Sequence, residues 1–581
     1  MSQNSMLRGV SVSSGIAHGV AYVLSSVDRT MVPRRSLKAA DVDAEIARFE
    51  SALTAAEKAL LTLREEVAHR IGASESEIFT AQALVVRDRA LYSQVVAVVQ
   101  QSQVNVEAAL VDVIDKYIRA LDQVPDAYLR ERAADVRDVG RRILGALAKD
   151  DGQSGLDIPE GAILVADELL PSTTARLEFS QVRALVTDRG GKFSHTSILA
   201  RSLRIPALTG IHEALSKIKT GDFLIVDGMS GILFVNPGDL VRSEYERLAD
   251  ELSAYRAGLQ KSIDLPSVTL DGTAVPLFAN ASKVSDTEAA YLYRADGIGL
   301  YRTEFAFSIR NAFPTEEEQY QLLKRAAERL HPRKIVLRLL DVGGDKQLSY
   351  LPLPASRNPS LSLRGIRLLL KRPEVLKTQL RAFLRVSADH PVSVLLPVVG
   401  GLEEVREARA VLTQVMAELT AEGTAFNATI PVGAMIEIPS AAALTSVLAK
   451  ELDFFSLGTN DLVQYMLAAD REDESAGDYY QPLHPAMLRT IRSVADAARA
   501  ANRPLTICGE MAGDPAYTEL LLGLGLREFS VAPGEMLEVK NAIRTATLAE
   551  AETLAAAALE LGSTREIEAL LDGRRRTKSK G

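Results

Sequence analysis

The second half of the chain alternates short apolar runs with longer, helix-favouring stretches from about residue 265 onward. Each run has the length of a strand, and each is followed by an amphipathic segment before the next run begins. The eight runs are Val275–Phe278, Gly297–Leu300, Ile335–Leu339, Val394–Leu396, Val432–Ile436, Phe454–Leu457, Leu505–Ile507 and Phe529–Val531. This alternation predicts a (β/α)8 barrel, with a doubly wound open sheet as the main alternative.

Composition limits the class of protein. At 581 residues the chain is too long for one hydrophobic core and predicts three or four modules. A net charge of −9 argues against a nucleic-acid partner, and the single cysteine, Cys508, excludes an intrachain disulfide. Neither a secretory signal nor a membrane-spanning apolar run is seen. We therefore expect a cytoplasmic protein without membrane insertion.

The first half changes its period twice. Residues 8–27 have a strand-like pattern, residues 36–148 are nearly free of glycine and have helical spacing, and strand-like runs return from about 152. This predicts an α/β domain interrupted by a helical bundle. The expected divisions are an α/β domain (1–30 and 149–236), the helical subdomain (31–148), a linker helix (237–264), the barrel (265–573) and a basic, frayed tail (574–581).

A glycine-led segment, Gly190-Gly191-Lys192-Phe193-Ser194-His195, precedes a helix-favouring stretch that runs to Arg201. Unpaired amides and the positive end of a helix dipole at such a junction favour a phosphoryl group on the His195 ring. The plainer interpretation is that Ser194 caps the helix and His195 fills its first turn.

Polar groups follow five of the predicted barrel strands. A barrel collects such groups beyond the carboxyl ends of its strands. Arginines suit phosphate and carboxylate, hard carboxylate oxygens suit Mg²⁺, and a thiol can donate a proton. The candidates are Arg302, Arg338 and Arg471 for an anion, Glu437 and Asp461 for Mg²⁺, and Cys508 for proton transfer. For Cys508 the alternative is a small buried hydrophobe.

Two further segments make these motifs specific. The stretch 297–305 (GIGLYRTEF) and the stretch 456–465 (SLGTNDLVQY), together with 190–201, resemble the enzyme I family, the phosphoenolpyruvate-protein phosphotransferases of the bacterial sugar phosphotransferase system. The histidine loop is also similar to those of pyruvate phosphate dikinase and phosphoenolpyruvate synthase. The resemblance covers essentially the whole chain.

The resemblance implies a fold, a reaction and roles for residues. The fold is multidomain α/β: a phosphohistidine α/β domain with an inserted helical bundle, a helical linker and a C-terminal (β/α)8 barrel. His195 takes the phosphoryl group of phosphoenolpyruvate and passes it to a histidine of the carrier protein HPr, which docks on the helical subdomain, and pyruvate is released. By resemblance the substrate contacts are Arg302, Arg338, Asn460, Asp461 and Arg471; the Mg²⁺ ligands are Glu437 and Asp461; the proton donor is Cys508; and the supporting residues are Thr174, Arg364 and Lys346.

Several positions depart from the family pattern. Lys192 and Phe193 replace an arginine or small residue and a threonine, and Gln82 replaces a histidine on the carrier-protein face. Ser362 stands where glycine is usual, which puts the backbone angle of that loop in question. Thr174 is expected to orient the His195 ring, or else to cap a helix that follows Pro171.

Other functions of the family's relatives remain as alternatives. A dikinase-type enzyme that uses ATP shares the swivelling histidine and the barrel, but it needs a large nucleotide-binding region. A regulatory protein without turnover would not need His195, Cys508, Glu437 and Asp461 together. Family members are dimers through the barrel domain. The carrier is either the sugar-type HPr or its nitrogen-regulatory counterpart, and the lack of an amino-terminal sensory domain favours the sugar branch.

Overall fold

The computed structural model describes most of the chain, and it divides into two compact units, 1–256 and 257–581. The described residues are 5–24, 33–70, 79, 82, 83, 85–122, 127–148, 158–169, 171–174, 177, 181–190, 195–203, 205–308, 310, 312–344, 346, 348, 350–354, 356–470 and 476–578. Within this part of the chain, no helix is long and apolar enough to cross a membrane. The cytoplasmic location stays a prediction.

The first unit contains a mixed eight-stranded sheet in the order β1-β8-β7-β3-β4-β5-β6-β2. Its strands come from both sides of the helical segment, so the helices are inserted into the domain that the sheet forms. The strands are β1 (Ser5–Arg8), β2 (Val10–Ser13), β3 (Ile16–Val23), β4 (Ala162–Ala166), β5 (Val182–Thr187), β6 (Ala207–Thr209), β7 (Phe223–Asp227) and β8 (Ile232–Val235). The helices of this domain are α6 (Pro171–Thr174), α7 (His195–Leu203) and α8 (Ala214–Lys217).

Both faces of this sheet are covered. Every residue of β4 is buried, and its alternate side chains enter two different hydrophobic clusters, Ile163 in one and Leu164 in the other. Side chains alternate across a strand, so a strand that is apolar at every position needs packing on both faces. Ala200 of α7 belongs to the same cluster as Leu164, and therefore α7 packs on that face.

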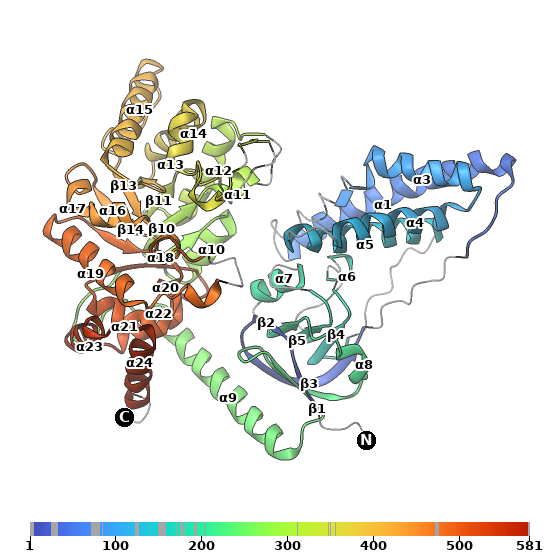
Figure 1. Cartoon of the computed structure of the whole chain (residues 1–581), viewed down its shortest axis with the longest axis horizontal. Helices are drawn as coiled ribbons and strands as arrows, with labels where there is room; N and C mark the ends of the chain where they lie inside the picture. The colour runs from blue at the N-terminus through green and yellow to red at the C-terminus, as the bar shows by residue number, and fades with distance from the viewer. Residues whose placement is uncertain are drawn as a thin grey trace. The chain divides into compact units, whose positions relative to one another are not determined.

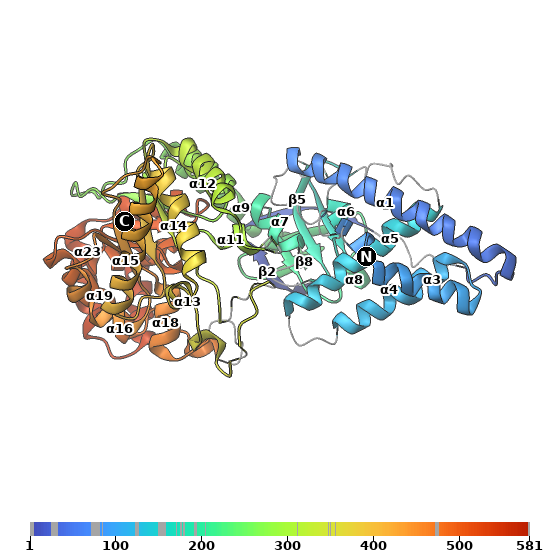
Figure 2. The ribbon, with the colours of Figure 1, turned by 90° about the horizontal axis from the view of Figure 1, so that it is seen from above.

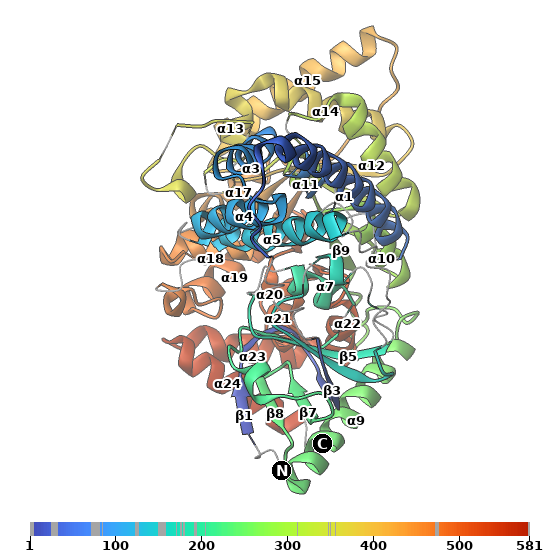
Figure 3. The same cartoon turned by 90° about the vertical axis from the view of Figure 1, so that its right-hand side faces the viewer.

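The inserted helices form one bundle (Figures 1 and 3). They are α1 (Val42–Arg70), α3 (Arg89–Ser102), α4 (Val106–Asp122) and α5 (Ala127–Ala148), preceded by the short η1 (Ala39–Asp41). Apolar residues at helical spacing, such as Phe49, Leu60 and Val67 on α1, are buried in its core, as the sequence predicts. The helix α9 (Asp239–Lys261) continues the chain toward the second unit and contains the boundary between the units.

The second unit is a closed barrel of eight parallel strands, in the order β9 to β16 around the ring. The strands are β9 (Leu277–Ala281), β10 (Gly297–Arg302), β11 (Lys334–Arg338), β12 (Val392–Leu396), β13 (Val432–Ile436), β14 (Phe454–Leu457), β15 (Leu505–Ile507) and β16 (Glu528–Val531). The predicted barrel is confirmed, and the open sheet is excluded. The bounds of β13, β14 and β15 agree with the prediction residue for residue.

Helices surround this barrel (Figures 1 and 2). They are α10 (Val284–Leu292), α11 (Glu304–Ser308), α12 (Glu316–Leu330), α13 (Ile366–Lys371), α14 (Pro373–Ser387), α15 (Leu402–Ala421), α16 (Pro439–Ala443), α17 (Thr445–Leu448), α18 (Thr459–Leu467), α19 (Pro485–Ala500), α20 (Glu510–Gly513), α21 (Pro515–Gly523), α22 (Met536–Arg544), α23 (Leu548–Glu560) and α24 (Thr564–Lys578). Two 3₁₀ turns, η3 (Pro359–Leu361) and η4 (Gly477–Tyr479), lie in their connections.

The prediction that the basic tail is frayed is wrong for residues 574–578. The helix α24 continues through Arg574 to Lys578. Arg574 is anchored because its guanidinium pairs with Glu519 and Glu550, each at 2.8 Å. Ile567 and Leu571 on the same helix are buried in the barrel's outer core, so packing as well as charge holds the helix in place.

Candidate active site

The residues that fill the interior of the barrel show which way the predicted site residues face. Leu300, Val336 and Met435 form a small buried cluster of their own, separate from the core between strands and helices. Side chains repeat every two residues along a strand, so the residues two positions later share that face. Those residues are Arg302, Arg338 and Glu437. They therefore face the barrel mouth, by which we mean the carboxyl ends of β9–β16.

Two later strands complete the mouth. After β14 the chain enters α18, whose second and third residues are Asn460 and Asp461. Cys508 follows β15 directly and is 1% exposed. The structure thus brings together five of the predicted strand ends at one mouth. Arg471 lies outside the described residues.

An ionic cluster lies at the mouth, and it consists of Glu304, Arg338, Asp341, Lys346, Arg364 and Asp461. Arg364 is the largest fully buried side chain in the described part of the chain, at 1% exposure. Its Nε donates to Asp341 Oδ1 at 2.8 Å and its Nη2 donates to Asp341 Oδ2 at 2.9 Å. The same Nη2 donates to Asp461 Oδ2 at 3.1 Å. One buried guanidinium therefore joins two carboxylates, one from the loop after β11 and one from the first turn of α18.

Arg338 enters the same cluster from β11. Its Nη2 donates to Glu304 Oε1 at 2.8 Å and lies 3.6 Å from Asp341 Oδ2. The Asp341 amide also donates to Glu304 Oε1, at 2.9 Å. Although burial opposes its charge, the carboxylates of Glu304, Asp341 and Glu437 hold the pKa of Arg338 above its ordinary value. Arg338 is therefore a permanent cation beside the mouth.

Glu437 and Asp461 follow the adjacent strands β13 and β14, and Glu437 is 1% exposed. Burial raises its pKa, and the negative charges of Asp461 and Asp341 raise it further. Its Oε1 accepts the Val398 amide at 2.6 Å. Asp461 Oδ1 is buried and has no hydrogen-bond partner within the described part of the chain. Two mutually repelling carboxylates with a free buried oxygen form a site that a hard divalent cation would stabilise.

The backbone beside Glu437 is strained. Val398 has φ of 56°, a region that a β-branched residue rarely enters. Gly365, which follows Arg364, also has φ of 56°, and a Cβ there would lie 2.6 Å from Val398 Cγ2. Such strain costs about 1–3 kcal/mol per residue and tends to persist at functional sites. Here it directs the Val398 amide toward the Glu437 carboxylate.

The barrel interior next to these charges is apolar, and we call this part the thiol corner: Cys508 with Leu300, Val336, Leu395 and Met435. It adjoins the ionic cluster, since Arg338 Nη1 lies 3.5 Å from Met435 Sδ. The Cys508 thiol donates weakly to the Leu457 carbonyl at 3.5 Å. Burial raises the pKa of this thiol to about 12, against the opposing charge of Arg302. The thiol is therefore protonated at neutral pH, as a proton donor must be.

Hydrogen bonds fix the loops on either side of the thiol. Asn280 Nδ2 donates to the Cys508 carbonyl at 3.2 Å, and Asn280 Oδ1 accepts from Ser530 Oγ at 2.7 Å. Asn460 Oδ1 accepts the Glu510 amide at 2.8 Å, and Asn460 Nδ2 donates to the Glu510 carboxylate at 3.1 Å. The Cys508 loop is thus held by β9 and by α18.

In the first unit, His195 is the first residue of α7, so the predicted helix in this segment is confirmed. The short helix α6 packs against both α5 and α7 (Figure 1). Thr174 is the last residue of α6 and is 2% exposed. It ends the helix that begins at Pro171, so both of its expected roles, orienting the His195 ring and capping this helix, stay predictions. Lys192, Phe193 and Ser194 lie outside the described residues.

Two departures from the family pattern have simple structural outcomes. Gln82 is 1% exposed, and its Nε2 donates to Asp138 Oδ2 at 3.2 Å inside the helical bundle. Its side chain is therefore not on an open face. Ser362 has φ of −88° and ψ of −165°, which is ordinary extended backbone. Serine is accommodated there without strain.

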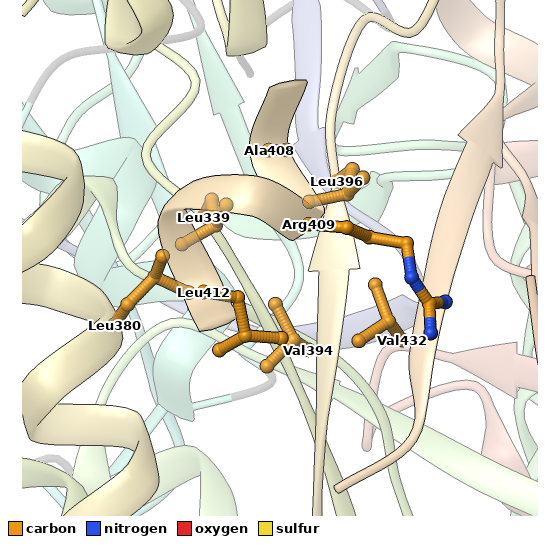
Figure 4. A pocket seen from close by; sticks show the side chains of 8 residues that line it. All are labelled: Leu339, Leu380, Val394, Leu396, Ala408, Arg409, Leu412 and Val432. Atoms are coloured by element: carbon orange, nitrogen blue, oxygen red, sulfur yellow. The ribbon is translucent and has the colours of Figure 1, made fainter. Parts of the chain in front are cut away.

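A small cavity lies outside the barrel mouth (Figure 4). It holds about 10 Å³ and is lined by Leu339, Leu380, Val394, Leu396, Ala408, Arg409, Leu412 and Val432. These residues belong to the barrel wall and to α14 and α15, on the outer side of the strands. The cavity has the volume of roughly one water and an apolar lining, so it is a packing void.

Three protein-family models match the chain in succession. Residues 8–132 match the N-terminal domain of PEP-utilising enzymes, residues 158–231 their mobile domain, and residues 256–548 their PEP-binding domain. A phosphoenolpyruvate-protein phosphotransferase of Haemophilus influenzae is 41% identical over 98% of each chain. The chain belongs to this family.

Other relatives extend the comparison. A phosphoenolpyruvate-protein phosphotransferase of Enterococcus faecalis is 40% identical over 98% of this chain and 99% of its own. The NMR solution structure of Enzyme I (nEIt) covers 42% of this chain and 99% of its own, with 33% identity and a TM-score of 0.36. The predictions of an enzyme of the phosphotransferase family and of its multidomain fold are confirmed.

Sequence reasoning about this phosphotransferase missed several residues at the mouth. Asp341, Glu304, Asn280 and Glu510 were not assigned a role, although each contacts a predicted site residue. Glu304 lies shortly after the end of β10 at Arg302, and Asp341 shortly after the end of β11 at Arg338, which was a usable signal. Their partners lie far away along the chain, so the pairing itself was not visible.

Proposed function

We propose that this chain transfers the phosphoryl group of phosphoenolpyruvate to His195 and then to a histidine of HPr, with release of pyruvate. This would be the first step of the sugar phosphotransferase system. The observation that carries the proposal is the convergence of Arg302, Arg338, Glu437, Asp461 and Cys508 at one barrel mouth in a member of the phosphotransferase family.

Anion recognition falls to the arginines. Phosphoenolpyruvate carries a phosphate and a carboxylate, and each matches the fork of a guanidinium. Arg302 is exposed at the rim, while Arg338 is buried and oriented by Glu304. Arg471 and the Asn460 amide complete the proposed set. Asn460 would exchange its bond with Glu510 for one with the substrate.

Mg²⁺ is proposed to bind Glu437 and Asp461. The free buried Oδ1 of Asp461 and the raised pKa of Glu437 support this assignment, because a cation would relieve both. Among the described residues no group of three or more His, Cys, Asp or Glu side chains could hold a metal. A pair of carboxylates suits Mg²⁺, which commonly keeps substrate and water ligands. When bound, it would neutralise charge on the substrate oxygens.

The chemistry divides between a nucleophile and an acid. A neutral nitrogen of His195 attacks phosphorus, and the bond from phosphorus to the enol oxygen breaks. The enolate that leaves takes a proton on its methylene carbon from the Cys508 thiol, which gives pyruvate. Solvent then reprotonates the thiolate. The high pKa of Cys508 supports this role, because the proton is present at the start.

Delivery requires two positions of His195. The first unit carries His195 and the second carries the barrel mouth, so the units must approach for attack and separate for transfer. We propose that the linker helix (237–264) permits this change. The amides at the start of α7 would bind the phosphoryl group, and Thr174 would orient the ring. Arg364 and Lys346 support the anion site from the ionic cluster.

The proposed partners follow from the same assignment. HPr would dock on the helical subdomain (31–148), and the chain would form a homodimer through its barrel. The α/β domain would comprise 1–30 and 149–236, and the barrel 265–573. The cytoplasm is the proposed location.

The test is transfer of label from ³²P-phosphoenolpyruvate in the presence of Mg²⁺, with and without HPr. Wild-type protein should acquire acid-labile, base-stable label and lose it to HPr, whereas His195→Ala should acquire none. His212→Asn is a matched control in the same unit, since asparagine tolerates the φ of 63° at that position. Equal labelling of wild type and His195→Ala would overturn the proposal. Labelling from ATP instead would favour the dikinase alternative.

Cys508→Ala tests the acid separately. We expect pyruvate formation to slow by at least about 100-fold, the usual size of a lost general acid, while phosphoenolpyruvate still binds. The measurement is single-turnover pyruvate release beside equilibrium binding of phosphoenolpyruvate. An unchanged release rate would remove Cys508 from the mechanism.

A further inference from the structure

Asp341 is the most enclosed charge of the ionic cluster, with a side chain 0% exposed. It accepts two hydrogen bonds from Arg364 and one from Lys346 Nζ at 2.7 Å, and Arg338 lies 3.6 Å away. Although burial opposes ionisation, these cations hold the pKa of Asp341 well below its ordinary value. Three cations that surround the mouth thus share one carboxylate.

The contact with Arg364 reaches the proposed metal ligand. Arg364 Nη2 donates both to Asp341 Oδ2 and to Asp461 Oδ2. The direction of this nitrogen is set by the paired bonds to Asp341, because two parallel bonds fix the plane of a guanidinium. The bond to Asp461 occupies Oδ2 and leaves Oδ1 buried without a partner. Asp341 therefore influences Asp461 indirectly, through Arg364.

The loops on both sides of Asp341 are joined by backbone contacts. Gly343 forms isolated bridges with Lys346 and with Arg364. Gly343 has φ of 104°, and a Cβ at this position would collide with the Leu363 carbonyl. Tyr465 Oη donates to the Ser360 carbonyl at 2.7 Å and ties the same loop to α18. The backbone thus holds the loop, and the Asp341 carboxylate is left to orient the cations.

We propose that Asp341 is a positioning residue that sets Arg364 and, through it, the orientation of Asp461 for a divalent cation. This inference rests on the proposed function, since it takes Asp461 to be a metal ligand. It assigns Asp341 no contact with substrate. A buried ion pair is poor evidence for stability, because a well-packed apolar pair of similar size is often as stable. Stability alone therefore does not explain why charged side chains are buried here. The need to orient the metal ligand Asp461 does explain it.

The first experiment measures Mn²⁺ binding to the full chain by electron paramagnetic resonance and calorimetry, with Mn²⁺ as the probe. Asp341→Asn keeps the shape of the side chain and removes its charge. Loss of a residue that orients a metal ligand commonly weakens affinity by 10–100-fold, and we expect a loss of about that size. Asp453→Asn is the matched control, because Asp453 accepts the amide of Val432 at the amino end of β13, away from the mouth.

A double-mutant cycle separates orientation from charge. If Asp341 acts through Arg364, adding Asp341→Asn to Arg364→Gln changes Mn²⁺ affinity by less than about twofold, because coupled residues are not additive. If Asp341 acts by its charge alone, the full loss recurs in the Arg364→Gln background. The single variant Asp341→Asn leaves Arg364 buried without its main partner and could fold poorly. The double variant removes that arginine as well, so Mn²⁺ affinity can still be compared between Arg364→Gln and the double variant. Thermal melting establishes which variants are folded.

Each result has a defined meaning. If Asp341→Asn binds Mn²⁺ as tightly as the wild-type chain, or if the two substitutions are fully additive, the positioning role of Asp341 is overturned. The proposed function is not affected by either result. Absence of Mn²⁺ binding by the wild-type chain overturns the metal assignment of the proposed function, and this inference with it. A 10–100-fold loss in Asp341→Asn that disappears in the Arg364→Gln background supports the inference.

Discussion

The ionic cluster and the thiol corner, two adjoining parts of the barrel mouth, have opposite effects on the pKa of a buried group. In the ionic cluster, Asp341 is as buried as a side chain can be and still has a lowered pKa, because three cations surround it. In the thiol corner, Cys508 is equally buried, and its pKa is raised because its neighbours are Leu300, Leu395 and Met435. Burial alone therefore does not decide a protonation state at this mouth. The decisive variable is whether opposite charges contact the buried group: Arg364 and Lys346 bond directly to Asp341, whereas the charge of Arg302 only partly offsets the burial of Cys508.

This contrast matches the two tasks of the proposed reaction. A phosphoryl group and its counter-ions need fixed charges, which the ionic cluster supplies as permanent cations and anions. A proton for carbon needs a group that keeps its proton until the enolate forms, which an apolar corner supplies. Glu437 lies between the two: it is buried like the thiol but faces Arg338 and Arg364 as well as two carboxylates.

The largest expected effect comes from breaking the ionic cluster. Arg364→Leu would leave the Asp341 and Asp461 carboxylates buried without their shared cation, which should destabilise the barrel by about 3–5 kcal/mol. Arg367→Leu is the control, because Arg367 is 43% exposed and pairs with Glu404 on the surface. It should lose less than about 1 kcal/mol. Urea unfolding followed by circular dichroism gives both values, and equal losses would contradict the contrast.

The thiol corner can be tested through reactivity, since Cys508 is the only cysteine. A thiol whose pKa is raised to about 12 is almost entirely protonated at pH 8, whereas an ordinary cysteine is partly ionised there. Alkylation by iodoacetamide should therefore be at least about 1000-fold slower than in the urea-unfolded chain, with burial adding to the effect. The rate should rise with pH up to about 12. A rate plateau near pH 9 would show that the corner does not protect the proton.

The intermediate case, Glu437, gives a pH dependence for metal binding. Its raised pKa means that the folded protein keeps a proton which the unfolded chain loses at lower pH. A divalent cation must displace that proton, so affinity should increase as pH rises through neutrality, by up to about tenfold per unit below the pKa. Calorimetry with Mn²⁺ from pH 6 to 8 in buffers of different ionisation enthalpy measures both affinity and proton release. Glu437→Gln should bind Mn²⁺ weakly and without this dependence.

The fold was predictable to the extent that local periodicity encodes it. The apolar runs predicted the bounds of β13, β14 and β15 correctly. The strand β9 extends beyond its predicted end through Ala279 and Asn280, which are not typical strand residues. The side chain of Asn280 bonds to Ser530 on the adjacent strand β16 and to the Cys508 carbonyl beyond β15.

The candidate site was predictable in its strand-end residues and not in their interactions. Arg302, Arg338, Glu437 and Cys508 follow strands, and closure of the barrel alone brings them together. The pairing of Asp341 with Arg364 depends on how two loops fold back on each other, which no local pattern records. The same holds for Gln82, whose burial against Asp138 depends on helix packing.

The smallest expected effect concerns the loop next to Arg364. Ser362→Gly restores the residue usual in the family at a position where the backbone is extended and unstrained. Glycine would gain nothing from its access to positive φ, would lose the bond from Ser362 Oγ to the Pro359 carbonyl, and would make the unfolded chain more flexible. We expect a loss of about 0.5–1 kcal/mol in unfolding free energy, with Mn²⁺ affinity unchanged. A gain in stability would show that serine strains this loop, and a change in metal affinity would show that the loop and not Asp341 sets the position of Arg364.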